Sequence, residues 1–256
     1  MDYNFHTHTV RCRHAIGTEE EYIAEAIKGG IKYLGFSEHI PFAFPDGYEG
    51  KSRVPVSQAE EYVSTLCTLR EKYKNDIEIK IGFEMEYYPT YFEQMLENAK
   101  NYGAEYLLLG HHFLHEEYPN GIHTNRPNES EEDLKEFVSH VVSGIESGVF
   151  TYVAHPDVFN FIGDEELYKT EMRKIIKAAV VNNTPLEINL LGIRKERNYP
   201  NMVFWEMAGE EQAAVTFGSD CHEPKYVCDM KSYLKAMEIV DKYNLNYIGK
   251  PILKTI

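Results

Sequence analysis

The sequence predicts an α/β fold in the form of a parallel barrel. Its 256 residues suit one large domain, and a hydrophobic content of 43% is enough to build a sizeable core. Short apolar runs alternate with longer amphipathic ones about seven or eight times, and no Pro/Gly/Ser-rich linker interrupts them. This alternation favours one barrel domain over residues 1–256. A doubly wound open sheet is the competing architecture, but no GxGxxG or GxxxxGKS/T motif supports its nucleotide-binding form.

The first half of the chain contains four expected strands. They are the short segment 2–6 and the apolar runs 31–37, 77–83 and 105–110. Thr18 and Glu21 form a capping box, which predicts a helix that continues to Gly29. Two further helices are expected, at residues 57–74 and at residues 89–102.

The second half repeats this pattern after a long polar loop at residues 116–128. Ser130 with Asp133 predicts the start of a helix that ends near Gly148. The other expected helices cover residues 164–181, 201–209 and 230–242, and the expected strands cover residues 150–154, 185–190, 213–218 and 246–249.

Charge and composition restrict the function. The chain has 26 Lys and Arg residues against 41 Asp and Glu residues, a net charge of −15 that repels nucleic acid phosphates. No apolar run is long enough to cross a membrane, and the first residues do not resemble a signal peptide. The four cysteines show no CxxC spacing and are expected to be reduced thiols. We therefore expect a cytoplasmic protein that binds neither nucleic acids nor membranes.

Polar residues that can bind metals recur at the carboxyl ends of the expected strands. His6 and His8 are two residues apart, so in an extended segment both imidazoles point the same way. Asp220 and His222 repeat this spacing after a later strand, with Cys221 facing the other side. In a parallel barrel these strand ends meet at one face, where active sites are built. Two such pairs predict a metal site.

The strands between these pairs add further candidates. Glu84 is the best candidate for a carboxylate that bridges two cations, and Glu86 is an alternative on the same side. His39 is a candidate ligand, while Glu38 is either a ligand or a partner that orients His39. His155 ends an apolar strand, where an unpaired imidazole is costly.

The remaining histidines divide into candidate ligands and histidines that are not expected to be ligands. His14 lies in the loop after the first strand and is a candidate. His111 and His112 offer one ligand between them, since neighbours in an extended chain face opposite sides. No role as a ligand is expected for His115, His123 and His140, although His115 and His123 sit in a long loop that could line a pocket.

These candidates predict more than one metal ion. A single zinc ion needs about three or four protein ligands, whereas this set suits two or three ions. Ligation rich in imidazole favours Zn, Mn or Fe over Mg or Ca, and clustered cations are well suited to phosphate ester hydrolysis. The candidate ligands are His6, His8, His14, His39, Glu84, His111 or His112, His155, Asp220 and His222.

In combination, these motifs resemble the polymerase-and-histidinol-phosphatase (PHP) superfamily. The shared pattern is HxH after the first strand, SEH at residues 37–39, a strand-terminal Glu, a GxHF-type motif at residues 110–113, an isolated His and a final DxH. The resemblance spans His6 to His222. It implies a distorted (β/α)7 barrel with three metal ions at the carboxyl ends of the strands. It also selects His112, which precedes Phe113 as the family ligand does.

The segment 187–195 (EINLLGIRK) is similar to the monofunctional histidinol-phosphate phosphatases, as is the pair Tyr199-Pro200. This resemblance implies a metal-dependent phosphomonoesterase that hydrolyses L-histidinol phosphate in histidine biosynthesis. It makes Arg194 the first candidate for binding the phosphate, with Arg197 second. A guanidinium group suits a phosphate monoester. Asp220 or a histidine such as His222 is expected to protonate the leaving group.

Three other functions compete with this prediction. The first is a PHP phosphoesterase that acts on another small phosphate or a nucleotide. The second is an amidohydrolase-type barrel, which commonly has a metal-binding Lys at a strand end; no Lys ends an expected strand here. The third is a metal-binding PHP module without activity, although this chain retains a full set of candidate ligands.

Overall fold

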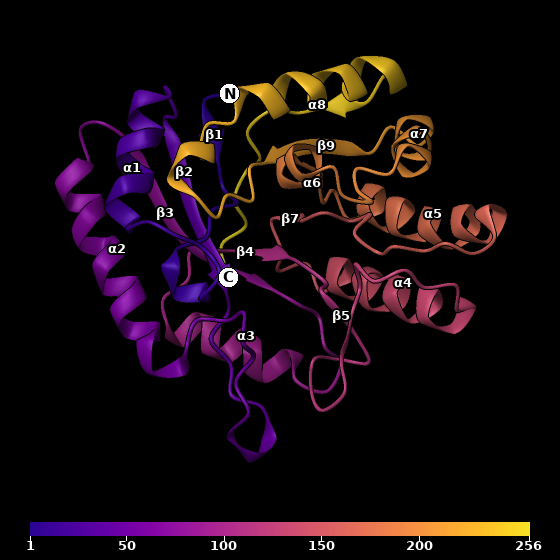
Figure 1. Ribbon diagram of the computed structural model, residues 1–256, viewed down its shortest axis with the longest axis horizontal. Helices are drawn as coiled ribbons and strands as arrows, with labels where there is room; N and C mark the ends of the chain where they lie inside the picture. Colours follow the sequence, from indigo (N-terminus) through magenta and orange to yellow (C-terminus); the bar gives the residue numbers. More distant parts are fainter.

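The computed structural model describes residues 1–256 as a curled sheet with helices on its outer side (Figure 1). Eight parallel strands follow the order β1-β2-β3-β4-β7-β8-β9-β10. Seven of them precede a helix and β10 is an additional edge strand, which confirms the expected distorted (β/α)7 barrel. The strands are β1 Tyr3–Asn4, β2 Tyr33–His39, β3 Glu78–Met85, β4 Tyr106–Leu109, β7 Tyr152–Val153, β8 Leu186–Asn189, β9 Ala214–Gly218 and β10 Asn246–Tyr247.

The helices begin where the sequence places capping residues. The Thr18 side chain and the Glu21 backbone N–H form the expected capping box of α1. Ser130 and Asp164 cap α4 and α5 in the same way. The helices are α1 Glu19–Lys28, α2 Ala59–Tyr73, α3 Phe92–Asn101, α4 Glu131–Glu146, α5 Glu165–Val181, α6 Leu190–Lys195, α7 Met202–Glu210 and α8 Met230–Tyr243. None of them is long and apolar enough to cross a membrane.

The barrel closes only at the carboxyl ends of its strands. Thr7 and Cys221 form a parallel bridge, in which the N–H of His8 donates to the carbonyl of Cys221 at 3.0 Å. This bridge joins the chain that leaves β1 to the chain that leaves β9. The segments that carry the HxH and DxH motifs are therefore hydrogen-bonded neighbours, although more than 200 residues separate them in sequence.

Two apolar clusters cover opposite faces of the sheet. Leu107 and Leu109 of β4 belong to the larger cluster, which contains the buried residues of the helices. Tyr106 and Leu108 alternate with them and therefore point to the inner face. There they pack in a smaller cluster with Tyr3, Phe5 and Tyr152. This aromatic cluster fills the interior of the curled sheet and leaves polar side chains at its carboxyl end.

Two structural elements differ from the sequence predictions. The segment that follows β4, including part of the expected polar loop, contains an antiparallel hairpin of β5 Phe113–Leu114 and β6 Ile122–His123. The residues directly after β8 form the short helix α6, whose amino end is capped by the side chain of Asn189. Both elements form walls of the site described next.

Candidate metal centre and active site

The structure brings all nine candidate ligands of the family pattern to the carboxyl end of the sheet. Their ring or carboxylate atoms form overlapping groups of three, each within 4.8 Å, that suit a metal ion. Eight of these side chains lie at or just beyond the end of a strand, as expected for a parallel barrel, and His14 lies in the loop that leads from β1 to α1. The nine residues are His6, His8, His14, His39, Glu84, His112, His155, Asp220 and His222.

Glu84 lies at the middle of this group, and its two oxygens face different sets of imidazoles. Its Oε2 atom is 3.4 Å from His6 Nε2 and 3.5 Å from His8 Nε2. Its Oε1 atom is 2.9 Å from His155 Nε2 and 3.4 Å from His112 Nε2. A carboxylate placed between two donor sets has the arrangement needed to bridge two cations.

Asp220 occupies the opposite side of the group. Its Oδ1 atom is 3.4 Å from both His8 Nε2 and His222 Nδ1. The Nε2 atoms of His222 and His14 lie 2.9 Å apart, while His14 Nδ1 is 2.8 Å from the carbonyl of Cys12. Since that carbonyl can only accept a hydrogen bond, Nδ1 carries the hydrogen, and in the neutral ring Nε2 keeps its lone pair beside His222.

The unpaired polar atoms at this centre fit a divalent cation. His6 Nε2, His8 Nε2 and both carboxylate oxygens of Glu84 are buried and make no hydrogen bond. Such atoms cost free energy when they are left without a partner. A mixed set of imidazole nitrogens and carboxylate oxygens suits Zn²⁺ and related transition metal ions. The residues therefore fit the group of divalent metals expected from the sequence.

Two side chains of the centre have protonation states that suit metal binding. Burial raises the pKa of Glu84, but the imidazoles of His112, His6 and His39 outweigh burial and hold this pKa well below its ordinary value. Burial and repulsion from His8 hold the pKa of His39 well below its ordinary value. A carboxylate and a neutral imidazole are the forms in which these side chains bind metals.

Carboxylates behind the ring of histidines fix the ring orientations. His6 Nδ1 lies 2.7 Å from Glu187 Oε1, and His112 Nδ1 lies 2.9 Å from Glu86 Oε1. Each contact places the proton on Nδ1 and leaves the Nε2 lone pair toward the centre. The structure thus places Glu86 behind His112 and not beside Glu84.

Glu38 also lies behind the ring of histidines. Its Oε1 atom accepts hydrogen bonds from the N–H and hydroxyl of Thr9, each at 2.6 Å. Its Oε2 atom lies 3.4 Å from His8 Nδ1 and accepts the N–H of His39. Of the two roles that the sequence left open, this geometry favours a partner that orients histidines, His8 most directly.

His111 and His112 separate as neighbours in an extended chain should. The His112 ring faces Glu84, whereas His111 is buried among aromatic side chains, with ring centroids 5.5 Å from Phe137 and 5.2 Å from His140. Both ring nitrogens of His111 lack a partner. Only His112 is positioned to bind a cation at the centre.

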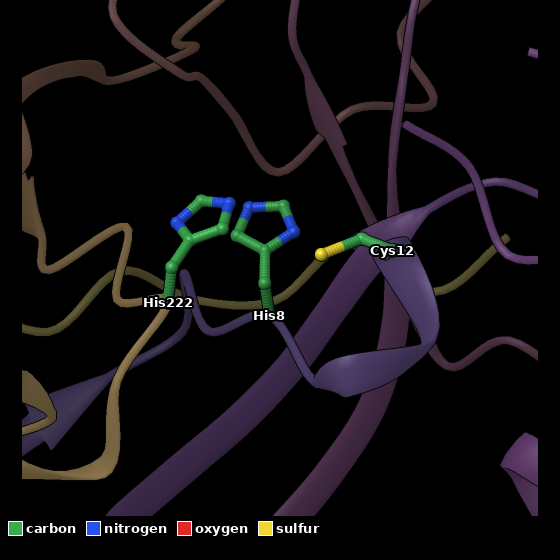
Figure 2. Close-up of side chains that lie close together, drawn as sticks. All are labelled: His8, Cys12 and His222. Atoms are coloured by element: carbon green, nitrogen blue, oxygen red, sulfur yellow. The ribbon is translucent and has the colours of Figure 1, made fainter. Parts of the chain in front are cut away.

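Cys12 lies at the edge of the centre but is held as a thiol. Figure 2 shows its sulfur beside the His8 ring, with His222 on the far side of that ring. The thiol donates to the carbonyl of Thr9 at 3.1 Å. Burial and the nearby carboxylate of Glu38 raise the pKa of Cys12. Since the thiolate is the metal-binding form, this environment disfavours Cys12 as a ligand.

A cavity of about 620 Å³ opens above the centre. Arg53 lines it, but both Glu86 and Glu117 accept hydrogen bonds from its guanidinium group. Lys195 and Arg197 also line it, and neither has a carboxylate partner within 4.0 Å. These two residues are the free cationic groups of the cavity wall.

The structure does not bring Arg194 to this cavity, which corrects the order of the two candidate arginines. Its guanidinium group donates to Asp229 Oδ2 at 2.8 Å and to the carbonyls of Ser219 and Asp220 at 3.3 and 3.4 Å. It also lies 4.3 Å from the centroid of the Tyr226 ring. With these partners, Arg194 supports the chain that carries Asp220 instead of facing a ligand.

Several cavity or support residues were not identified from the sequence. His123 lines the cavity, although no role as a ligand was expected for it, and Arg53 and Lys195 line it as well. Glu187 holds His6 from behind. Its position two residues before Asn189, at the end of a strand, was a usable signal. For His123 the only signal was its place in a long loop that could line a pocket.

Comparison with known proteins defines the class of this chain. A family model described as the PHP domain matches residues 4–190, so the chain belongs to the PHP domain family. It is a phosphoester hydrolase of that family.

Its relatives specify the group within the family. A probable histidinol-phosphatase of Deinococcus radiodurans is 23% identical over 228 residues, which cover 86% of this chain and 85% of the relative. The histidinol-phosphatase of Bacillus subtilis is 25% identical over 253 residues, covering 85% of this chain and 92% of the relative. These relatives confirm the resemblance to histidinol-phosphate phosphatases.

A solved structure shares the fold. The histidinol phosphate phosphatase of Lactococcus lactis, in complex with zinc, L-histidinol and phosphate, has a TM-score of 0.73 at 18% sequence identity. The match covers 96% of this chain and 95% of that protein. This similarity confirms the distorted TIM-like barrel.

Proposed function

We propose that this protein hydrolyses L-histidinol phosphate to L-histidinol and inorganic phosphate. The main supporting observation is the position of Glu84, buried between two sets of imidazoles below a cavity with two free cationic side chains. The substrate is suggested by the relatives, which carry histidinol-phosphatase names, and by the solved complex of the Lactococcus lactis enzyme. A role in histidine biosynthesis and a cytoplasmic location belong to the same proposal.

We propose two or three divalent ions, Zn, Mn or Fe, held by the nine ligands of the family pattern. Zinc is supported by the complex of the Lactococcus lactis protein. When bound, such ions supply positive charge to the phosphoryl group and make water more acidic. Glu84 is the proposed bridging ligand, because its oxygens face different donor sets.

The cavity residues bind and orient the ester in this proposal. Arg197 donates to the hydroxyl of Tyr199 at 2.8 Å and lines the cavity. Together with Lys195 it offsets the charge of the phosphate dianion. Arg194 holds the backbone at Asp220 and does not touch the substrate.

In the reaction, a water oxygen bonds to phosphorus while the bond from phosphorus to the ester oxygen breaks. One proton of the water must leave, and the departing alkoxide must gain one. The pKa of Asp220 is held well below its ordinary value by the neighbouring imidazoles, so this residue is proposed as the carboxylate that accepts the proton of the water, and solvent in the cavity supplies the proton to the departing alkoxide. The products are the free alcohol and inorganic phosphate.

The deciding experiment is phosphate release from L-histidinol phosphate by protein loaded separately with Zn, Mn or Fe. An aryl phosphate monoester serves as the comparison substrate. We expect fast release from histidinol phosphate, its loss after chelation, and its return when metal is added. Phosphate release from the aryl ester alone would support phosphoesterase activity but rule out L-histidinol phosphate as the substrate. Metal-loaded protein that hydrolyses neither ester would contradict the proposed function.

A further inference from the structure

The β5–β6 hairpin forms a fixed wall of the cavity. Phe113 and His123 are directly paired in its antiparallel register. The next residue, Thr124, is fully buried and donates its N–H to the carbonyl of His112 at 2.8 Å. Its hydroxyl donates to the same carbonyl at 3.1 Å. These bonds fasten His123 to the segment that carries His112, so its position relative to the centre is set by the backbone.

The hydrogen bonding of His123 determines its tautomer. The backbone N–H of Asn125 lies 3.3 Å from His123 Nδ1 and can only donate. Nδ1 is therefore the acceptor nitrogen, and in the neutral ring the proton sits on Nε2. Both His123 and Asn125 line the cavity. The half-buried ring thus offers one N–H donor to a ligand.

The charges around His123 indicate which ligand group it meets. Since Nδ1 accepts the N–H of Asn125, the ring is in its neutral form. Lys195 and Arg197, the two cationic side chains of the cavity wall without a carboxylate partner, line the same cavity. A substrate ammonium group would be repelled there, whereas an anionic oxygen would be attracted.

We propose that His123 is a substrate-binding residue whose Nε2–H donates a hydrogen bond to a phosphoryl oxygen of the bound ester. The inference rests on the proposed function, because it assigns a contact within the same cavity. Arg197 supplies charge and His123 supplies a directed neutral donor. In this arrangement two sides of the cavity bind the phosphoryl group. His123 binds it from the β5–β6 hairpin, and Arg197 binds it from the segment that follows α6.

Substitutions that keep or remove this donor test the proposal. His123→Gln keeps an N–H near the position of Nε2, whereas His123→Phe keeps the ring and removes the donor. The binding constant of inorganic phosphate to zinc-loaded protein, measured by calorimetry, is the readout, because it requires no turnover. We expect His123→Phe to weaken binding about 10- to 100-fold, as for a hydrogen bond to a charged group, and His123→Gln to stay within about threefold of the unmodified protein.

His115 provides a matched control next to the same hairpin. Its side chain is 42% exposed and pairs with Glu136, away from the cavity. His115→Asn, which tolerates the positive φ of 59° at this position, should leave phosphate binding unchanged. Zinc content should be the same in all variants.

Two results would overturn the inference. One is unchanged phosphate binding in His123→Phe, and the other is equal weakening in His123→Gln and His123→Phe, which would indicate packing alone. Failure of the proposed function is seen separately, as absence of histidinol phosphate hydrolysis by the unmodified protein.

Discussion

At the scale of single residues, Glu187 supports the centre through contacts with several segments, although it does not line the cavity. It is fully buried, and its Oε1 atom accepts the Nδ1 proton of His6. Its Oε2 atom accepts the N–H of His155 and the side-chain amide of Asn189, both at 2.9 Å. One carboxylate therefore positions segments from three strands.

Replacing this carboxylate should weaken metal binding. In Glu187→Gln, the amide retains one acceptor oxygen but meets donors on both sides, so one contact must be lost. We expect metal affinity to fall about 10- to 100-fold, the usual effect of removing the partner of a metal-bound histidine. Competition with a chromogenic chelator measures this affinity without turnover. Glu171→Gln, at a buried carboxylate on α5 outside the site, is the control and should bind metal normally.

The two arginines of segment 187–197 should respond differently to substitution. Arg197 lines the cavity, so Arg197→Ala should lower kcat/KM about 10- to 100-fold through lost contact with the phosphate. Arg194 is bonded to Asp229 and backbone carbonyls, so Arg194→Ala should act mainly through stability. Steady-state kinetics together with thermal unfolding separate the two effects. Loss of phosphate inhibition in Arg194→Ala with unchanged stability would restore Arg194 as the phosphate ligand.

At the scale of elements, the helices follow closely from the sequence, because their amino ends carry local signals. Thr18, Ser130 and Asp164 act as caps where their sequence pattern indicates. The regular strands are found near the predicted positions, although some are much shorter than the apolar runs that predict them. At β1 only Tyr3–Asn4 pairs regularly, since the chain then turns toward Cys221 and the barrel closure.

The capping box of α1 offers a test of this local control. Thr18→Ala removes the side chain that accepts the N–H of Glu21 and leaves one orphan donor at the helix start. We expect a loss of about 1 kcal/mol in the free energy of unfolding, with unchanged turnover. Urea unfolding measures the loss. Thr18→Ser keeps the hydroxyl and should be close to the unmodified protein; an equal loss in both variants would contradict the capping explanation.

The sequence predicted the site residues that lie at strand ends, where side chains alternate between two faces. It did not predict the positions of residues in turns and loops. The HxH and DxH pairs meet because residues two apart share a face and parallel strands end together. The choice between Arg194 and Arg197 depended on α6, followed by Glu196 in the left-handed region with a φ of 50°. That reversal leads the chain back to the cavity at Arg197, and no strand or helix periodicity encodes it. The hairpin that carries His123 pairs only two residues per strand, too few to produce an alternating pattern.

At the scale of the whole molecule, the histidines of this chain link its stability to pH in two opposite ways. Where burial and neighbouring cations lower a histidine pKa, the unfolded chain takes up a proton that the folded chain does not, so stability falls as pH drops below about 6.5. Where carboxylates raise the pKa, the folded chain holds the proton more tightly, so stability falls as pH rises toward the folded pKa. The histidines with a lowered pKa, called the lowered group below, are His14, His39, His111, His123, His140 and His222. The histidines with a raised pKa, called the raised group, are His6, His8 and His112.

These opposing effects predict a stability maximum for the metal-free protein near pH 6.5. Between pH 6.5 and 5 the six histidines of the lowered group bind more protons in the unfolded chain than in the folded chain. Burial raises the pKa of Asp157 to about 6, so this carboxyl group acts in the opposite direction over the same range. Because the lowered group is larger, the urea midpoint should decrease. Above pH 6.5 the raised group loses its stabilising contribution, over a range that extends to the pKa of about 9 for His8. Glu84 and Asp220 have pKa values held well below their ordinary range, so their contribution is lost only at more acidic pH. Urea unfolding of chelator-treated protein from pH 5 to 9 tests this maximum. A midpoint that rises steadily from pH 6.5 down to pH 5 would contradict the neutral state of His39 and His222, two of the proposed ligands.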